Sequence, residues 1–150
     1  MLPDSFKFEL VTPERRVVQA TVVAAEIPAS EGYIGVLPGH APLLGAMGMG
    51  ELSYRDAQGT HYAAVFGGYV EVLAGRVIVL AETAERAEEI NADRARAARE
   101  TARKILATPG TPEETAGPAR EAIARAEIRL KVAGQASGVS ARGAEAVHSA

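Results

Sequence analysis

Histidine, serine and acidic side chains are the groups in this chain that could carry out catalysis or bind a metal. The three histidines, His40, His61 and His148, are far apart, and none belongs to a ligand pattern such as HExxH. No serine lies in a GxSxG elbow, so a nucleophilic triad has no support. Glu26 and Glu82 are the nearest approach to paired carboxylates, but acids at strand ends are usually solvated. We therefore predict neither an active site nor a metal site.

The segment 31–50 is the most unusual stretch of the chain, because Glu31 is its single charged residue. Its glycines and prolines interrupt any helix, so it cannot be a membrane span. The Gly-rich run 45–50 is spaced GxxGxG and no Walker lysine follows, which argues against a phosphate cradle. Pro38-Gly39 is a strong turn signal. We predict short extended pieces joined by tight turns, which present an apolar loop carrying His40 to a partner.

Charge is distributed unevenly along the 150 residues. Residues 1–88 carry six basic and eleven acidic side chains (net −5), and residues 89–150 carry ten and eight (net +2), which together give the overall −3. Such a change indicates a domain boundary. The chain has no cysteine, which excludes disulfides and thiolate metal sites. A pI near 5.7 argues against nucleic-acid binding, and without a secretory signal we expect a cytoplasmic protein.

The first domain is predicted to be all-β. Residues 6–10 and 51–55 alternate apolar and polar side chains with period two, as in strands with one buried face. Turn signals such as 56–59 recur about every eight to twelve residues, which is typical of a sandwich or barrel. Gly67 and Gly68 are expected to break or bulge a strand. We predict an all-β sandwich over residues 1–88.

The second domain is predicted to be an antiparallel α-helical hairpin over residues 89–134. Residues 91–106 contain no glycine or proline, and Asn91 or Asp93 can cap the helix start. The sequence Thr-Pro-Gly-Thr-Pro at 108–112 ends this helix, and a second helix is expected to begin near Thr115 or Pro118. Apolar stripes with spacings of three and four run along both helices: Ala95, Ala98, Ala102 and Ile105 in the first, and Ala119, Ile123, Ala126, Leu130 and Ala133 in the second.

These stripes consist mostly of alanine. Because burial contributes about 25 cal/mol per Å² and alanine has little area, we expect a hairpin that is weakly held to itself and to the sandwich. The segment 135–150 is small, polar and Gly/Ser-rich, and we expect it to be disordered.

Several motifs occur in a fixed order along the chain. They are Thr-Pro-Glu-Arg at 12–15, Gly-x-x-Gly-x-Leu-Pro-Gly-His-Ala-Pro-Leu at 32–43, Phe-Gly-Gly-Tyr-Val-Glu-Val at 66–72 and Ala-Glu-Thr-Ala at 81–84, followed by the Ala/Arg-rich hairpin. In this combination the chain resembles the epsilon subunit of bacterial F-type ATP synthases over about residues 1–133.

The resemblance implies a central-stalk rotor subunit that has no active site and no tightly bound cofactor. Its expected partners are the gamma subunit, the c-ring and, when the hairpin extends, the catalytic beta and alpha subunits. It is expected to lie peripherally on the cytoplasmic face of the plasma membrane. The residues alone leave a second interpretation open, a small-ligand-binding β-sandwich module with a helical dimerisation tail. The first should co-purify with a rotary ATPase, and the second should self-associate.

The resemblance also suggests contact residues. For the c-ring they are Glu31, His40, Ala41 and Pro42, and the alternative is that this loop only shapes a turn. An extended hairpin would offer a basic surface to the acidic contact segment of the beta subunit, through Arg96, Arg99, Arg103, Arg120, Arg125 and Arg129. The alternative is that these arginines only solubilise an alanine-rich helix.

Some relatives bind ATP in the folded hairpin through a motif that begins Ile/Leu-Asp-x-x-Arg-Ala. This chain has Ile90, Asn91, Arg94 and Ala95 at the corresponding positions. Asn91 replaces the acid and supplies no carboxylate, although Asp93 lies close by. The resemblance therefore leaves weak ATP binding open.

Overall fold

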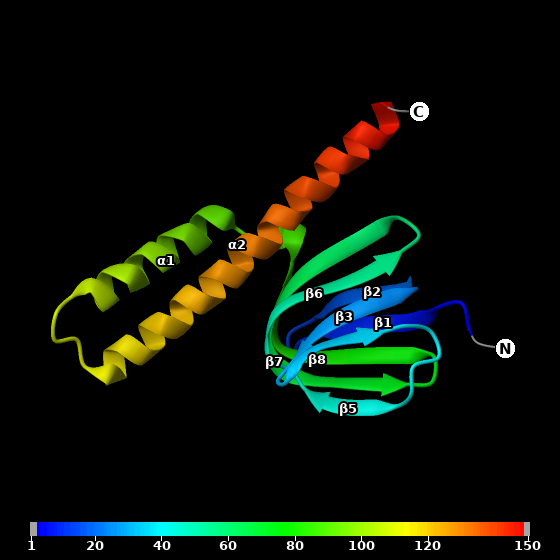
Figure 1. Ribbon diagram of the computed structural model, residues 1–150, viewed down its shortest axis with the longest axis horizontal. Coiled ribbons are helices and arrows are strands. Elements are labelled where there is room, and N and C mark those ends of the chain that lie inside the picture. Colours follow the sequence, from blue (N-terminus) through cyan, green and yellow to red (C-terminus); the bar gives the residue numbers. More distant parts are fainter. Residues whose placement is uncertain (1–2, 149–150) are drawn as a thin grey trace.

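The computed structural model describes the backbone of residues 3–148 and the side chains of residues 3–136. Eight strands come first and two helices follow (Figure 1). The strands are β1 (Phe6–Val11), β2 (Arg16–Val22), β3 (Ala24–Ala29), β4 (Gly32–Val36), β5 (Leu43–Ala46), β6 (Met49–Asp56), β7 (Gly59–Leu73) and β8 (Arg76–Arg86). A 3-10 turn, η1 (Ala87–Glu89), then leads to α1 (Ala92–Ala107) and α2 (Glu113–His148). The predicted β-sandwich followed by a helical hairpin is confirmed.

Strand β7 runs through both layers of the sandwich. The strand order is β2-β1-β8-β7-β6-β3-β4, with β5 also paired to β7, and only β1 and β8 are parallel. The first half of β7 pairs with β6, and its second half pairs with β5. Between the halves lie Gly67 and Gly68, with φ of +68° and +107°. Glycine adopts both conformations without a Cβ clash, so the strand bends here instead of ending.

Alternating side chains of these strands fill the main core. Phe8 and Leu10 from β1 meet Val70 from β7 and Val79 from β8, and all four are fully buried. The Phe8 ring stacks on Tyr54 with ring centroids 5.2 Å apart. Within residues 3–136, no polar or charged side chain is buried. The sandwich is therefore held by apolar contacts on its inner faces, as period-two alternation predicts.

Local signals set the limits of the hairpin helices. The Asn91 side-chain oxygen accepts a hydrogen bond from the Arg94 amide at 3.0 Å and caps α1. After α1 ends, Gly110 has a φ of +76° in the turn that leads to α2. Helix α2 begins at Glu113, slightly before the predicted start. The buried residues where the helices meet are all alanines: Ala95, Ala102, Ala116, Ala119 and Ala126.

Helix α2 extends beyond the predicted hairpin. It continues past Gly134 to His148, whereas the sequence led us to expect a disordered tail over 135–150. Residues 149–150, and the side chains of 137–148, lie outside the described part of the chain. A helix that is already nucleated extends into alanine-containing sequence at low cost, which overrides the local Gly/Ser signal.

Candidate functional site

The four residues expected to contact a c-ring lie in two separate turns. Glu31 precedes β4, and His40, Ala41 and Pro42 follow it in the loop that leads to β5. Glu31, Ala41 and Pro42 are exposed, whereas His40 is half-buried. Five residues of β4 span about 16 Å at 3.3 Å per residue. The structure therefore separates Glu31 from the other three along the length of β4.

The turn that carries His40 is tight and well defined. The His40 amide donates a hydrogen bond to the Leu37 carbonyl at 3.1 Å, and Gly39 has a φ of +87°. Proline followed by a glycine with positive φ is the pattern of a type II turn, so the predicted turn at Pro38-Gly39 is confirmed. The ring nitrogen Nδ1 of His40 lies 2.6 Å from the Ala41 carbonyl oxygen. The backbone thus holds this loop in one shape.

Large apolar side chains are exposed beside these turns. Leu44 is 72% exposed, Leu37 62% and Tyr33 57%. All three lie within residues 31–46, and exposed apolar side chains of this size are typical of a segment that binds a partner. This surface, formed by the loop and strands of 31–46, agrees with the predicted apolar loop. The identity of its partner, the c-ring, is implied only by the family resemblance.

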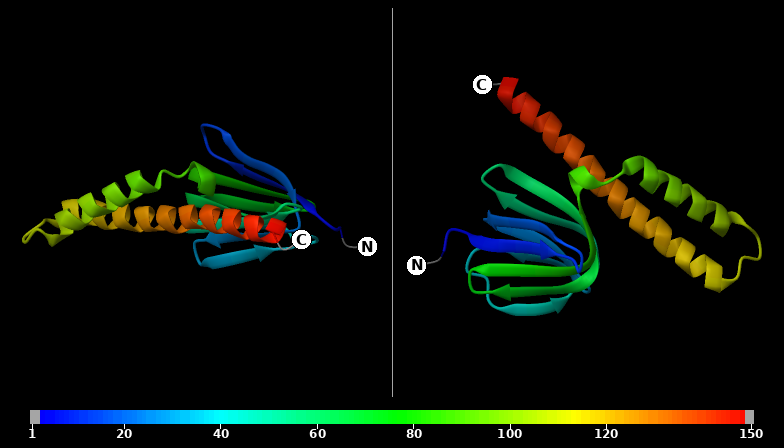
Figure 2. Two further views of the ribbon diagram at one scale, coloured as in Figure 1. Left: turned by 90° about the horizontal axis from the view of Figure 1, so that it is seen from above. Right: turned by 180° about the vertical axis from the view of Figure 1, so that it is seen from behind.

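The hairpin packs on a second face of β7. Figures 1 and 2 show α2 running past the edge of the sandwich where β6 and β7 lie. A small apolar cluster joins them: Ala64 and Phe66 from β7, Ala87 from η1 and Val132 from α2 are all buried. Because Ala63 and Val65 point into the main core, this part of β7 is covered on both faces. We call this contact the docking face, defined by Ala64, Phe66, Ala87 and Val132.

Two arginines of α2 cover the Phe66 ring. The guanidinium carbon of Arg129 lies 4.7 Å from the ring centroid, and that of Arg125 lies 5.5 Å from it. Arg129 also donates a hydrogen bond through Nε to Glu85 at 2.7 Å. Cation–π contacts contribute about 0.5–2 kcal/mol each, depending on solvent access. These two arginines therefore hold the hairpin against the sandwich.

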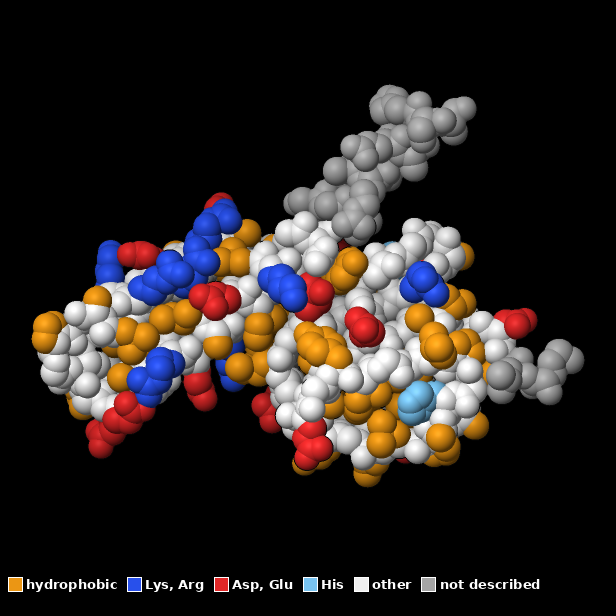
Figure 3. All heavy atoms as spheres, in the orientation of Figure 1, with side chains coloured by type: hydrophobic (Ala, Val, Ile, Leu, Met, Phe, Trp, Pro, Cys, Tyr) orange, Lys and Arg blue, Asp and Glu red, His pale blue; other side chains and the backbone are white. Residues whose placement is uncertain are grey.

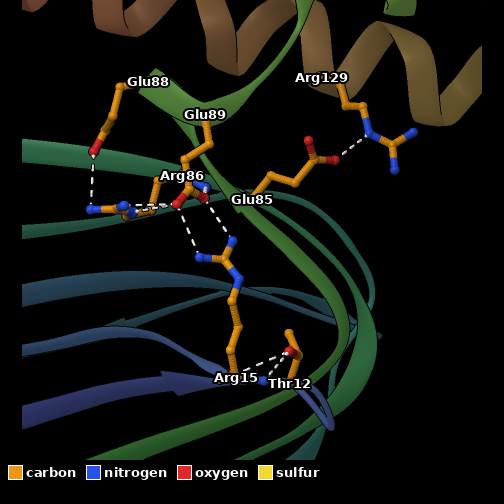
Figure 4. Close-up of polar contacts among 7 residues, drawn as sticks. All are labelled: Thr12, Arg15, Glu85, Arg86, Glu88, Glu89 and Arg129. Carbon is orange, nitrogen blue, oxygen red and sulfur yellow. Dashed lines mark hydrogen bonds and ion pairs between the residues drawn. The ribbon is translucent and has the colours of Figure 1, made fainter.

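A cluster of ionic groups joins the sandwich to η1 (Figure 4). The Arg15 guanidinium donates two hydrogen bonds to Glu89, at 3.0 and 2.8 Å, in a bidentate arrangement. Arg86 donates to the same carboxylate through Nη2, Nε and its backbone amide, at 2.7 to 3.1 Å. We call Arg15, Arg86 and Glu89 the junction clamp. The hydrogen bonds from Arg15, assisted by those from Arg86 and opposed by partial burial, lower the pKa of Glu89 to about 2.

This pKa predicts an acid-dependent loss of stability. The native pKa of Glu89 lies below its ordinary value of 4.5, so the clamp stabilises the folded chain fully above about pH 4.5. We expect that contribution, about 1–2 kcal/mol after solvent screening, to disappear as the pH falls from about 4.5 to about 2. Urea unfolding at several pH values measures it. Glu89→Gln should be less stable near neutral pH, and its free energy of unfolding should change less as the pH falls. If that free energy falls equally steeply with pH in both chains, Glu89 is not the group responsible.

Of the other four arginines expected to contact a beta subunit, three form ion pairs within the hairpin. Arg96 pairs with Asp93, Arg120 with Glu113, and Arg103 approaches Glu127 on the opposite helix at 3.9 Å. Arg99 is half-buried on α1. Figure 3 shows basic and acidic side chains interspersed over the hairpin. Exposed pairs of this kind contribute at most about 1 kcal/mol each, so a partner could replace them easily.

The residues at the ATP-motif positions have structural roles in this conformation. Asn91 caps α1, Ala95 is buried, and Ile90 packs half-buried against the docking face. Arg94 is exposed. The structure thus gathers these four residues at the start of α1, where the Asn91 side-chain oxygen already accepts the capping hydrogen bond.

Sequence reasoning did not single out Phe66, Val132 and Glu89, which join the hairpin and η1 to the sandwich. A signal for Phe66 was present, because Ala-Ala-Val-Phe at 63–66 lacks the polar alternation of a strand with one wet face. Val132 lies outside the alanine stripe of its helix, so the heptad-like pattern did not select it. Glu89 is 74 residues from Arg15, and no local pattern connects them.

Metal clusters and membrane spans are both absent from the part of the chain that the structure describes. Within those residues, no group of three or more His, Cys, Asp or Glu side chains is arranged to hold a metal ion. Over the same range, no helix has the length and apolar character needed to cross a membrane.

Comparison with known proteins matches both domains in order. Residues 5–87 match the family model described as the ATP synthase delta/epsilon chain β-sandwich domain, and residues 88–134 match its long α-helix domain. An ATP synthase epsilon chain of Solibacter usitatus is 46% identical over 132 residues, covering 88% of this chain and 98% of that one. That of Syntrophobacter fumaroxidans is 45% identical over 133 residues, with the same coverage.

Solved structures agree. A chain in the cryo-EM structure of the Euglena gracilis mitochondrial ATP synthase, OSCP/F1/c-ring, has a TM-score of 0.75 and 26% identity, over 89% of this chain and 83% of that one. A chain in the Tetrahymena thermophila ATP synthase central stalk/c-ring structure has a TM-score of 0.54 at 15% identity, over 87% and 98%, and shares the fold. With a sandwich, a docked hairpin and sequence matches that span both, this protein belongs to the ATP synthase delta/epsilon chain family.

Proposed function

We propose that this chain is a rotor subunit of the ATP synthase central stalk, where it joins the gamma subunit to the c-ring without an active site of its own. Family membership supports the stalk position, and the solved relative from Euglena gracilis comes from an assembly of F1 with a c-ring. In that position the chain would lie peripherally on the cytoplasmic face of the plasma membrane. The exposed apolar surface of 31–46 is the observation that carries the c-ring contact.

Crosslinking tests the c-ring contact. Cysteine introduced at Glu31 or His40 is expected to form a disulfide or short crosslink with a cysteine placed in the loop of subunit c in assembled enzyme. Ala57→Cys is the matched control, because Ala57 is exposed in the β6–β7 turn, on the other side of the sandwich from β5 (Figure 1). If neither position captures subunit c more often than the control, the contact is wrong.

We further propose that the hairpin inhibits ATP hydrolysis when it leaves the sandwich. The supporting observation is that Arg125 and Arg129, which an extended hairpin would offer to the beta subunit, are occupied by Phe66 and Glu85 in the docked state. Docking and contact with the beta subunit therefore compete for the same side chains. The apolar part of this interface is small, because two of its four buried side chains are alanines, so the cost of such an exchange is limited.

Deletion of residues 89–150 tests inhibition. In enzyme reconstituted with the shortened chain, we expect ATP hydrolysis to rise about fivefold or more over enzyme with the full chain. ATP-driven proton pumping should persist, which shows that the sandwich still assembles. Unchanged hydrolysis with intact pumping would remove inhibition from the proposal.

ATP binding by the docked hairpin stays a prediction. Calorimetric titration with millimolar ATP tests it, and Asn91→Asp is the informative variant, because it restores the missing acid and retains a capping oxygen. Absence of heat in both chains would end this prediction. If the chain is instead a ligand-binding module with a dimerisation tail, it should not co-purify with a rotary ATPase.

A further inference from the structure

The junction clamp lies where the chain leaves the sandwich for the hairpin, and the Thr12–Arg15 turn sets its position. The Thr12 amide donates to the Arg15 carbonyl at 2.9 Å, and the Arg15 amide donates to the Thr12 hydroxyl at 3.3 Å. These bonds fix the backbone from which the Arg15 side chain reaches Glu89 (Figure 4). A bidentate arginine on a carboxylate that a second arginine also holds is a rigid arrangement.

The clamp is separate from the contacts that hold the hairpin. Its three members belong to the β1–β2 turn, β8 and η1, and within residues 3–136 no side chain of α1 or α2 donates to or accepts from them. Helix α2 is held through Phe66 and Glu85 of the sandwich instead. Ala87 packs near Val132, so η1 meets the hairpin core through a small apolar side chain. Loss of the α2 contacts therefore leaves the hydrogen bonds of the clamp intact.

The backbone after the clamp has the features of a pivot. Ile90 and Asn91 are extended, with φ and ψ of −73° and 127° and of −84° and 97°, between η1 and α1. The Ile90 amide makes only a long hydrogen bond of 3.4 Å to Ala87. Asn91 caps α1 from its own side chain, so the helix start does not depend on the sandwich. Element-terminal residues of this kind absorb the dihedral changes of hinge motion.

The geometry points to a fixed junction: the clamp keeps η1 on the sandwich when the hairpin leaves, and the hairpin pivots at Ile90 and Asn91. This inference depends on one part of the proposed function, namely that the hairpin leaves the sandwich. Arg15 is then a positioning residue, since it limits the directions in which a released hairpin can point. In a chain without the clamp, the pivot would lie nearer the N-terminus, at the end of β8, and the hairpin would adopt a wider range of orientations.

Distances between spin labels in the full chain test this inference. Labels at Glu14 and Glu88 report the clamp, and labels at Glu14 and Glu100 report the hairpin; all three positions are exposed, and Glu88 approaches Arg86 only to 3.7 Å. The hairpin is released by Phe66→Ala, which removes the ring under Arg125 and Arg129. We expect the 14–100 distribution to broaden about twofold or more and the 14–88 distribution to stay unchanged. Parallel broadening of both would overturn the fixed junction.

A second variant tests the clamp without hairpin release. Arg15→Ala in the otherwise unaltered chain should broaden the 14–88 distribution, and Arg15→Lys, which keeps the charge but not the bidentate fork, should have an intermediate effect. A 14–88 distribution that stays narrow in Arg15→Ala overturns the clamp. If the 14–100 distribution stays narrow in Phe66→Ala, the release on which the pivot rests is contradicted, the rotor role is unaffected, and Arg15→Ala alone decides on the clamp.

Discussion

Gly68→Ala is expected to destabilise the sandwich severely. Gly68 has a φ of +107°, and a Cβ at this position would lie 1.9 Å from the carbonyl oxygen of Leu80. The neighbour is backbone in a paired strand, so it cannot move aside without loss of the β7–β8 pairing. Backbone strain alone costs about 1–3 kcal/mol, and the clash adds to it. Against a total stability of about 5–15 kcal/mol, we expect a loss of about 4 kcal/mol or more.

Gly75→Ala is the matched control. Gly75 also has a positive φ, +72°, but a Cβ at this position would meet no other atom within 4 Å. This variant should lose about 1–2 kcal/mol, the cost of a left-handed conformation alone. Urea unfolding followed by circular dichroism measures both variants. If Gly68→Ala loses no more stability than Gly75→Ala, the bend in β7 does not depend on the close approach to Leu80.

Phe66→Ala is expected to release the hairpin while the sandwich stays folded. Phe66 is 1% exposed and lies in the docking face, outside the main core cluster. Truncation of a buried phenylalanine costs about 3–5 kcal/mol, and here it also removes the ring that Arg125 and Arg129 cover. The contacts left to hold α2 would be the partly buried Tyr62 and Ile128 and the hydrogen bonds of Arg129 and Gln135 to the sandwich.

Two measurements check this release. In the isolated chain, trypsin should cut the hairpin arginines much faster, while thermal unfolding of the sandwich stays cooperative. In reconstituted enzyme, the proposed inhibition predicts lower ATP hydrolysis than with the unaltered chain. Phe66→Leu is the control, because it retains apolar volume without the aromatic face and should release the hairpin only in part. Slow cleavage and unchanged hydrolysis in Phe66→Ala would mean that Phe66 does not hold the hairpin.

Much of this architecture could be predicted from local patterns. Period-two alternation and turn residues indicated the sandwich, and the glycine- and proline-free stretch after Asn91 indicated the hairpin. Pro38-Gly39 indicated a turn that the structure contains, because its dihedral preferences act within a few residues. The ordered motifs of the chain also indicated its family. These are properties of short segments, and a sequence displays them directly.

The tertiary structure alone decided what the segments do to one another. It showed that β7 is one bent strand whose residues 63–66 are buried on both faces, that Arg125 and Arg129 cover Phe66, and that Arg15 reaches Glu89. Each contact joins residues far apart in the chain, and it depends on strand register and on which face of α2 meets the sheet. Local periodicity contains no information on either. Two of the arginines assigned from the sequence to a partner therefore hold the hairpin on its own sandwich in this conformation.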